Sequence, residues 1–138
     1  MALSFSAAIT RLETLLAIDD FTVWAGEPAI PAKKVAAWWY TGPSENSLIA
    51  ETLTDHPYAE RITCRFYWSV GQRGKAPSRA LELDVQSVTR TFIASLEADR
   101  DLAASVEILT IEDGDTGWLA VDNAWWRIST IPLAIGFT

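Results

Sequence analysis

The sequence contains very few of the residues that build metal centres and nucleophilic active sites. Among 138 residues there is one cysteine, Cys64, and one histidine, His56. A single cysteine cannot form an internal disulfide, and one histidine with one cysteine cannot supply the three or four ligands of a zinc site. No serine lies in a nucleophile-elbow pattern, and a Ser–His–Asp triad would depend on His56 alone. We therefore expect no metal, no cofactor and no enzymatic activity.

Basic residues and long apolar runs are also scarce. The chain has 11 lysines and arginines against 18 aspartates and glutamates, for a formal net charge of -7. Proteins that grip nucleic acid need a basic surface, and this composition does not provide one. No run approaches the roughly 18 apolar residues of a membrane span, and the N-terminus lacks the pattern of a secretion signal. We expect a protein made in the cytosol, with no membrane association and no specific nucleic-acid binding.

The most informative stretch is residues 61–70, where apolar residues occupy every second position. A period of two is typical of a strand with one buried face. The intervening positions carry Thr63, Arg65, Tyr67 and Ser69, which suit a wetter face. We expect a central antiparallel strand in which Cys64 is an inert core residue. The apolar set is Ile62, Cys64, Phe66, Trp68 and Val70.

Two segments have helical periodicity. In residues 78–98 the apolar positions are spaced four, three, four and four, which gives one stripe along a long helix. Near the start, Phe5, Ile9, Leu12 and Leu16 predict a shorter helix of about three turns that ends around Asp19-Asp20, with Ser4 or Ser6 as its cap. Because the long helix and the central strand are large complementary surfaces, we expect Trp68 and Phe92 to share one core cluster. The stripe consists of Leu81, Val85, Val88, Phe92 and Leu96.

The remaining pattern predicts short strands, at residues 21–24, 34–41, 105–112, 117–122 and 125–133, around an irregular region at 42–60. Asp113-Gly114 is a typical head of a hairpin joining the third and fourth of these strands. The last three strands then form an antiparallel meander. We expect one α+β domain over residues 1–138, a mainly antiparallel sheet with an N-terminal helix and one long central helix packed on one face.

Two loop features have both a structural and a chemical interpretation. Asp113 and Asp115 alternate along the chain and could hold a hard cation, but a third spaced ligand is missing and both residues suit a turn. The sequence leaves open whether they bind a cation. His56 is interpreted as a surface-loop residue, because no partner for acid–base chemistry stands near it in the chain.

Adjacent tryptophans occur twice, at Trp38-Trp39 and at Trp125-Trp126. Neighbouring strand residues point to opposite faces, so each pair should place one indole on each side of the sheet. The face without helices should then carry an exposed aromatic patch that lines a pocket or contacts another subunit, unless the outer indoles merely pack on loops and long side chains. The apolar island at 47–53 is long enough to act as an arm that reaches a neighbour. The subunit-interface candidates are Trp38, Trp39, Leu48, Ile49, Leu53, Trp125 and Trp126.

The order of these elements resembles the tail terminator proteins of long-tailed phages, of the lambda type, and of related phage-like particles. The resemblance covers nearly the whole chain and lies in element order and size; no motif residue can be carried over. It implies a non-enzymatic protein that forms a hexameric ring, caps the tail tube and joins it to the head-side connector proteins. It also implies a place in the tail or neck of the virion, assembly in the host cytoplasm, and a channel that lets DNA pass without binding it.

The competing hypothesis is a curved sheet that wraps a ligand pocket, as in the NTF2-like superfamily. Its aromatic lining would be Trp38, Trp68, Trp126 and Tyr67. Such a pocket needs convergent polar groups, and His56 with Asp55 or Asp122 is the acid–base set that the sequence offers. The two hypotheses differ in whether these side chains converge on one side of the sheet.

Overall fold

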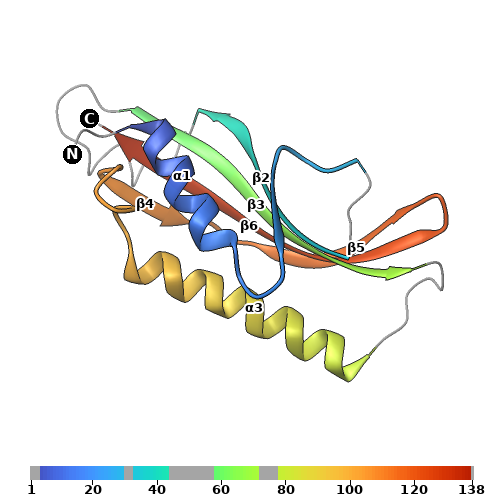
Figure 1. Cartoon of the computed structure of the whole chain (residues 1–138). Coiled ribbons are helices and arrows are strands. Elements are labelled where there is room, and N and C mark those ends of the chain that lie inside the picture. The colour runs from blue at the N-terminus through green and yellow to red at the C-terminus, as the bar shows by residue number, and fades with distance from the viewer. Residues whose placement is uncertain (1–3, 30–32, 44–57, 72–77, 138) are drawn as a thin grey trace.

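The computed structural model describes residues 4–29, 33–43, 58–71 and 78–137. Within these ranges, two helices pack on one six-stranded, mostly antiparallel sheet (Figure 1), which confirms the predicted α+β class. Neither helix is long and apolar enough to cross a membrane. The elements are α1 (Phe5–Leu16), β1 (Thr22–Ala25), β2 (Lys34–Pro43), β3 (Tyr58–Gly71), α3 (Arg79–Ala98), β4 (Ile108–Ile111), β5 (Asp115–Val121) and β6 (Ala124–Phe137).

Both helices begin at a serine cap. The Ser4 hydroxyl accepts a hydrogen bond from the N–H of Ala7 at 3.2 Å, and the Ser78 hydroxyl accepts one from the N–H of Leu81 at 3.3 Å. Each cap satisfies a backbone donor that the first helical turn leaves unpaired. Arg11 on α1 also pairs with Asp99 at the end of α3, with 2.6 Å between Nε and Oδ2. Both predicted helices are confirmed, although α1 ends at Leu16, before the predicted Asp19-Asp20, and the middle of α1 is tied to the end of α3.

Strand β3 lies in the middle of the sheet, antiparallel to β2 on one side and to β6 on the other. As predicted, Ile62, Cys64, Phe66 and Trp68 are buried and contribute to the core beneath the helices. Burial raises the pKa of the Cys64 thiol, because a thiolate would lose its hydration there. This agrees with the predicted role of Cys64 as a small core residue.

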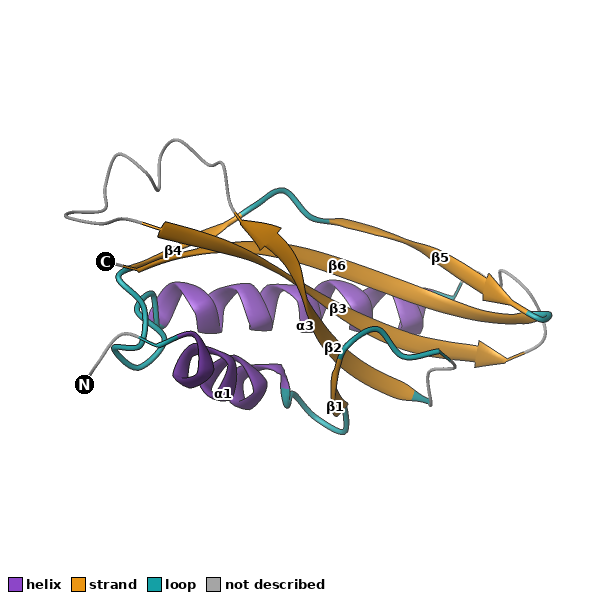
Figure 2. Ribbon diagram, turned by 90° about the horizontal axis from the view of Figure 1, so that it is seen from above, coloured by secondary structure: helices purple, strands orange, loops and turns teal. Residues whose placement is uncertain are grey.

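The opposite side of β3 differs from the expectation of a wetter face. Tyr67 is fully buried, in a second apolar cluster on the side of the sheet away from the helices. Aromatic and β-branched side chains from β2 and β6 pack beside it across the strands. The sheet therefore has apolar clusters on both faces, and α1 and α3 cover one of them (Figures 1 and 2).

The main core forms where α3 crosses β3. The Phe66 ring meets the Phe92 ring edge-on, with 5.4 Å between the centroids, and Phe21 meets both Phe66 and Trp68 edge-on at 5.1 and 5.3 Å. The indole N–H of Trp68 donates to Asp84 on α3 at 2.7 Å, so the buried tryptophan keeps a polar partner. Trp68 and Phe92 belong to one core cluster, as predicted.

The predicted hairpin at Asp113-Gly114 is wrong. Strands β4 and β5 both pair antiparallel with β6 and follow one another along the same edge. Between them, Asp113 and Gly114 lie opposite the single residue Ile131, so the chain makes a β-bulge instead of reversing. The chain does reverse at Asp122-Asn123, whose positive φ values of 49° and 66° suit a tight two-residue turn between β5 and β6.

The other edge of the sheet contains a parallel pair of strands. Strand β1 runs parallel to β2 and pairs only with residues from Val35 to Trp38. The irregular region predicted at 42–60 is shorter than expected, since β2 continues to Pro43 and β3 begins at Tyr58. A four-residue edge strand leaves the rest of β2 beyond its reach.

Replacing Phe92 with alanine should lower the free energy of unfolding by about 3 to 5 kcal/mol, because it leaves a cavity beneath β3. Leu83 on the same helix is half exposed, so Leu83→Ala should change stability by no more than about 0.5 kcal/mol. Urea denaturation of both variants and the unchanged chain gives the comparison. Equal, small losses in the two variants would show that the α3 stripe does not carry the core.

Candidate functional site

The face of the sheet away from the helices carries a compact aromatic cluster, which we call the far-face cluster. It consists of buried Val35, Ala37, Tyr67 and Trp126, with Trp39, Leu119, Val121, Ala124 and Ile128 packed around them. Trp38 contacts the opposite, helix-side core, and its indole N–H donates to Glu13 on α1 at 3.0 Å. The prediction that Trp38 and Trp39 point to opposite faces is therefore confirmed, and strand alternation gives the same division for Trp125 and Trp126.

The far-face cluster is not the exposed patch that the sequence predicts. Trp126 is only 3% exposed and Tyr67 is fully buried. The Arg65 guanidinium lies over the Trp39 and Tyr67 rings, 5.2 and 5.8 Å from their centroids, and donates to the Thr130 hydroxyl at 2.8 Å. This stacking lets an arginine stem cover apolar surface while its charge stays paired. The expectation of an exposed patch is wrong for Trp126.

The aromatic residues proposed for a single pocket are divided between the two faces. Trp38 and Trp68 contact the helix-side core, whereas Tyr67 and Trp126 belong to the far-face cluster. A β-sheet lies between the two pairs, so they do not line one cavity. Asp122 lies in the exposed turn between β5 and β6, and His56 and Asp55 lie outside the described residues.

Exposed aromatic side chains lie instead along the edge formed by β1 and β2. Trp24 is 41% exposed and Tyr40 is 50% exposed. Neither is among the interface candidates that the sequence predicts. The Tyr40 hydroxyl donates to Glu60 at 2.5 Å, which raises the pKa of Tyr40. The Tyr40 ring packs edge-on against Phe5, with 6.0 Å between centroids, beside a small open cavity of about 210 Å³. These two exposed aromatic side chains make this edge a candidate contact surface.

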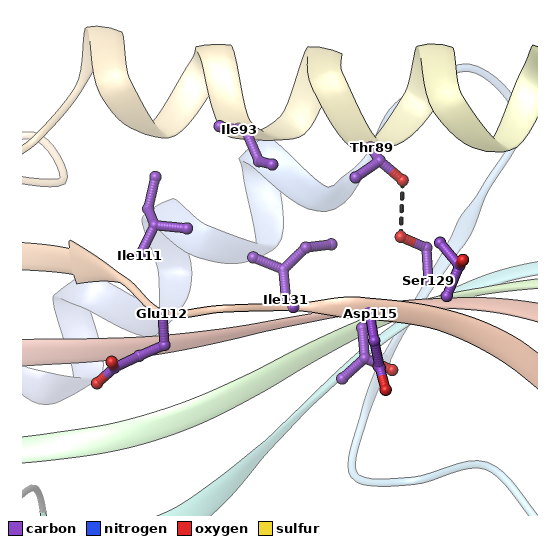
Figure 3. A pocket seen from close by; sticks show the side chains of 10 residues that line it. Thr89, Ile93, Ile111, Glu112, Asp115, Ser129 and Ile131 are labelled. Carbon is purple, nitrogen blue, oxygen red and sulfur yellow. Dashed lines mark hydrogen bonds between the residues drawn. The ribbon is translucent and has the colours of Figure 1, made fainter.

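A groove between α3 and the opposite edge of the sheet opens at the β-bulge (Figure 3). Its volume is about 330 Å³. The Thr89 and Ser129 hydroxyls bond each other across it at 2.6 Å, and Ser129 is buried. Ile93, Ile111 and Ile131 contribute apolar lining. The groove thus combines an apolar surface with hydroxyls that already satisfy each other.

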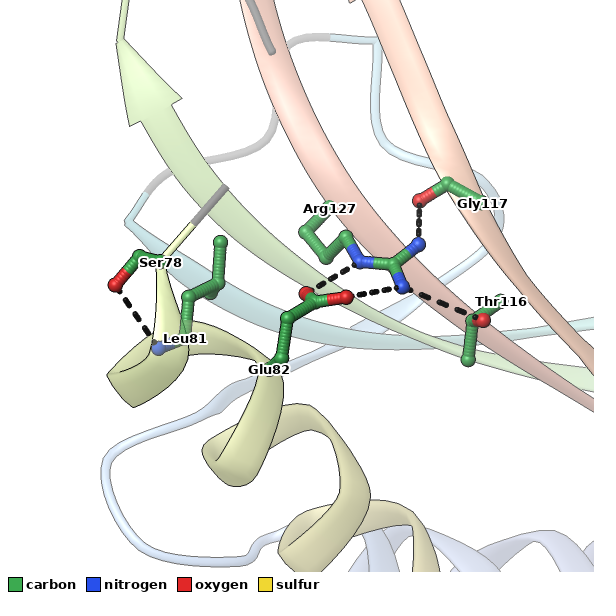
Figure 4. A network of polar contacts seen from close by, with 6 residues as sticks. All are labelled: Ser78, Leu81, Glu82, Thr116, Gly117 and Arg127. Carbon is green, nitrogen blue, oxygen red and sulfur yellow. Dashed lines mark hydrogen bonds and ion pairs between the residues drawn. The ribbon is translucent and has the colours of Figure 1, made fainter. Parts of the chain in front are cut away.

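Beyond the groove, Arg127 on β6 clamps the start of α3 (Figure 4). Its Nε and one terminal nitrogen each donate to a different Glu82 oxygen at 2.8 Å, and its other terminal nitrogen donates to the Gly117 carbonyl at 2.9 Å. The guanidinium also lies 5.3 Å from the centre of the Trp118 ring. Bidentate pairing with Arg127 lowers the pKa of Glu82 despite partial desolvation. The clamp joins helix, β5 and β6 at one end of the molecule.

Several predicted features lie outside the described residues or find no partner set. Leu48, Ile49, Leu53 and the whole 47–53 island belong to the part of the chain that the structure does not describe. Asp113 precedes Gly114 in the bulge, and Asp115 begins β5. Within the described ranges, no group of three or more histidine, cysteine, aspartate or glutamate side chains is placed to hold a metal ion.

Comparison of the sequence with protein-family models and with curated proteins finds no match in either set.

Replacing Gly114 with alanine should destabilise the protein by about 1 to 3 kcal/mol, because a β-carbon there would come within 2.2 Å of the Thr130 carbonyl oxygen. This oxygen belongs to the backbone, so it cannot move aside as the end of a flexible side chain could. Gly117 is the matched control, since a β-carbon there would meet only the Ile128 side chain at 3.9 Å. Thermal melts of Gly114→Ala and Gly117→Ala make the comparison; a Gly114→Ala variant as stable as the unchanged chain would contradict the bulge.

The Arg127–Glu82 pair should make stability depend on pH. Because the folded-state pKa of Glu82 is depressed, its contribution is present above the unfolded pKa and disappears as the pH falls through the folded pKa. Glu82 is about half exposed, so solvent screening limits the contribution to about 0.5 to 1 kcal/mol.

Denaturant unfolding at neutral and strongly acidic pH measures this effect. Glu82→Gln should be less stable than the unchanged chain at neutral pH, and the difference should shrink in acid. Glu97→Gln alters an exposed carboxylate on the same helix and serves as control. A difference for Glu82→Gln that persists at low pH would exclude the ion pair as its cause.

Proposed function

We propose that this protein is a non-enzymatic structural subunit of the tail terminator type, which closes into a hexameric ring. In this role the ring caps a phage tail tube, stops its growth and presents its other surface to the head-side connector proteins. It acts in the tail or neck of the virion after assembly in the host cytoplasm. The support from the sequence is the element order that resembles this family.

The structural observation that carries the proposal is a sheet with two unlike edges. One edge is β1 and the free part of β2, where Trp24 and Tyr40 are exposed; the other is the bulged edge of β4 and β5. Cyclic rings need heterologous contacts, in which one surface of each subunit meets a different surface of the next. A subunit with two different edges on opposite sides of one sheet meets this requirement.

The charge of the chain is consistent with a ring around passing DNA. The formal net charge is -7, so a channel lined by this protein would have few cations to hold phosphates. Two partly buried arginines are also paired locally, Arg65 with Thr130 and Glu27, and Arg127 with Glu82. DNA would therefore pass with little electrostatic retention.

The full-length chain should form closed rings of one stoichiometry, alone at high concentration or on the ends of purified tail tubes, and should stop tube elongation. Native mass spectrometry and negative-stain electron microscopy measure both. Trp24→Glu should abolish ring formation while the monomer keeps its melting temperature, whereas Leu83→Glu, which changes an exposed leucine on α3, should not. A chain that stays monomeric with tubes and leaves their growth unchanged would overturn the proposal.

A further inference from the structure

Strand β2 has an open edge just beyond β1. Strand β1 ends at Ala25, and the last contact along this edge is the Gly26 N–H donating to the Trp38 carbonyl at 2.7 Å. Strand β2 continues for five more residues, to Pro43, and within the described ranges no strand pairs with their outer side. On the inner side these residues remain paired with β3 across a β-bulge, in which Thr41 has no partner of its own and Gly42 has a φ of 111°. Trp39 and Tyr40 are therefore held in extended form with the outer side free, and the strand bends at the bulge that follows.

The orientation of the backbone follows from the bond at Trp38. Main-chain groups of successive strand residues point alternately to the two neighbouring strands, so residues two apart point the same way. The Trp38 carbonyl points toward β1, and the N–H and carbonyl of Tyr40 accordingly point to the open side. An extended polypeptide placed in line with β1 would satisfy both groups, which is the geometry of strand addition.

The side chains beside this edge are apolar on both faces of the sheet. Trp39 and the exposed Trp24 lie on the far face, and Tyr40 and Phe5 lie on the helix side. An added strand would thus bury apolar residues at both of its alternating positions. Arg61 adds a charge requirement: it is exposed, makes no ion pair with any described residue, and lies directly opposite Gly42. The occupant should carry an acidic group near its end.

The β5–β6 hairpin of a second copy meets these requirements. The outer side of β5 pairs with no strand in the described part of the chain, and Leu119, Val121 and Trp118 are only partly buried. Asp115 and Asp122 are exposed at its two ends. Figures 1 and 2 place the hairpin turn at the end of the molecule opposite both chain termini, so it extends away from its own β2 edge.

The position of β1 also excludes a symmetrical alternative. If two copies of β2 paired antiparallel about Tyr40, residue 42 of each would face Trp38 of the other, where Gly26 is already bonded. A hairpin reverses at Asp122-Asn123 and can end short of β1. The contact is therefore between unlike edges, as ring closure requires.

We propose that subunits join by strand addition, with β5 of one copy lying along residues 39–43 of β2 in the next. This inference rests on the proposed ring function and specifies its contact. It predicts one sheet that continues from subunit to subunit, with the hairpin turn of each copy ending near the β1 strand of its neighbour.

Cysteine cross-linking tests the contact without relying on tail tubes. Tyr40→Cys chains are mixed with Thr116→Cys or with Ala120→Cys chains and oxidised; these positions are exposed and lie on the helix side of the sheet, whereas Cys64 is buried and does not compete. At least one mixture should give a disulfide-linked dimer between unlike chains, since paired strands bring α-carbons within disulfide range. Arg90→Cys, on the exposed side of α3, is the control partner and should give none. Absence of a linked 40–116 or 40–120 dimer, or equal linkage to position 90, would overturn the proposal.

A second variant separates backbone pairing from loss of the ring. Tyr40→Pro removes the outward N–H but none of the bonds to β3, so the monomer should stay folded, as melting checks. Its self-association should weaken by about tenfold more than that of Tyr40→Ala, which keeps the N–H. Equal effects would contradict strand addition. If rings form on tubes but no 40–116 or 40–120 link appears, this contact is wrong and the proposed function stands. If the link forms but tubes are never capped, the function fails and the contact stands.

Discussion

Packing between α3 and one row of β3 side chains holds the two layers of this protein together. Phe66 meets Phe92 edge-on and lies tilted beside Trp68, and Asp84 on the same helix accepts the Trp68 indole N–H. Each fully buried large side chain contributes roughly 1.5 to 3 kcal/mol from removal of apolar surface from water. Because β3 is the central strand, this contact also sets the positions of β2 and β6 relative to the helices. β2 and β6 in turn pair with the strands at the two edges of the sheet.

The two edges of the sheet limit pairing with other strands to different degrees. Along β4 and β5 the bulge at Asp113-Gly114 interrupts the regular ladder and opens the groove beside α3. Bulges and charges of this kind hinder uncontrolled pairing between sheets. Along β2, the five residues beyond β1 are open beside Trp24 and Tyr40, and a bulge at Thr41 bends the end of this edge. The short regular stretch at Trp39 and Tyr40 is therefore the part of this edge that another strand can extend.

The far-face cluster explains how a two-layer α+β protein keeps a second apolar surface out of water without a third layer. Arg65 spans Trp39 and Tyr67, and its guanidinium is held by Thr130 and Glu27. Burial raises the pKa of the Tyr67 hydroxyl, which has no hydrogen-bond partner in the described part of the chain. An unpaired buried hydroxyl costs about 1 to 3 kcal/mol, which burial of the surrounding apolar side chains must offset.

Periodicity in the sequence was enough to determine β3, α1, α3 and the face on which the helices pack, because these depend on residues close together in the chain. Alternation also divided Trp38 from Trp39 correctly. The local pattern at Asp113-Gly114 does not determine its structure, because Asp-Gly suits a turn and a bulge equally. Only the pairing of both flanking strands with β6 distinguishes a bulge from a turn here. Burial of Trp126 and exposure of Trp24 and Tyr40 likewise depended on the cover provided by distant residues and on where β1 stops beside β2. Local patterns specify which side chains share a face, whereas strand pairing over long sequence separations decides which of those faces and edges remain open.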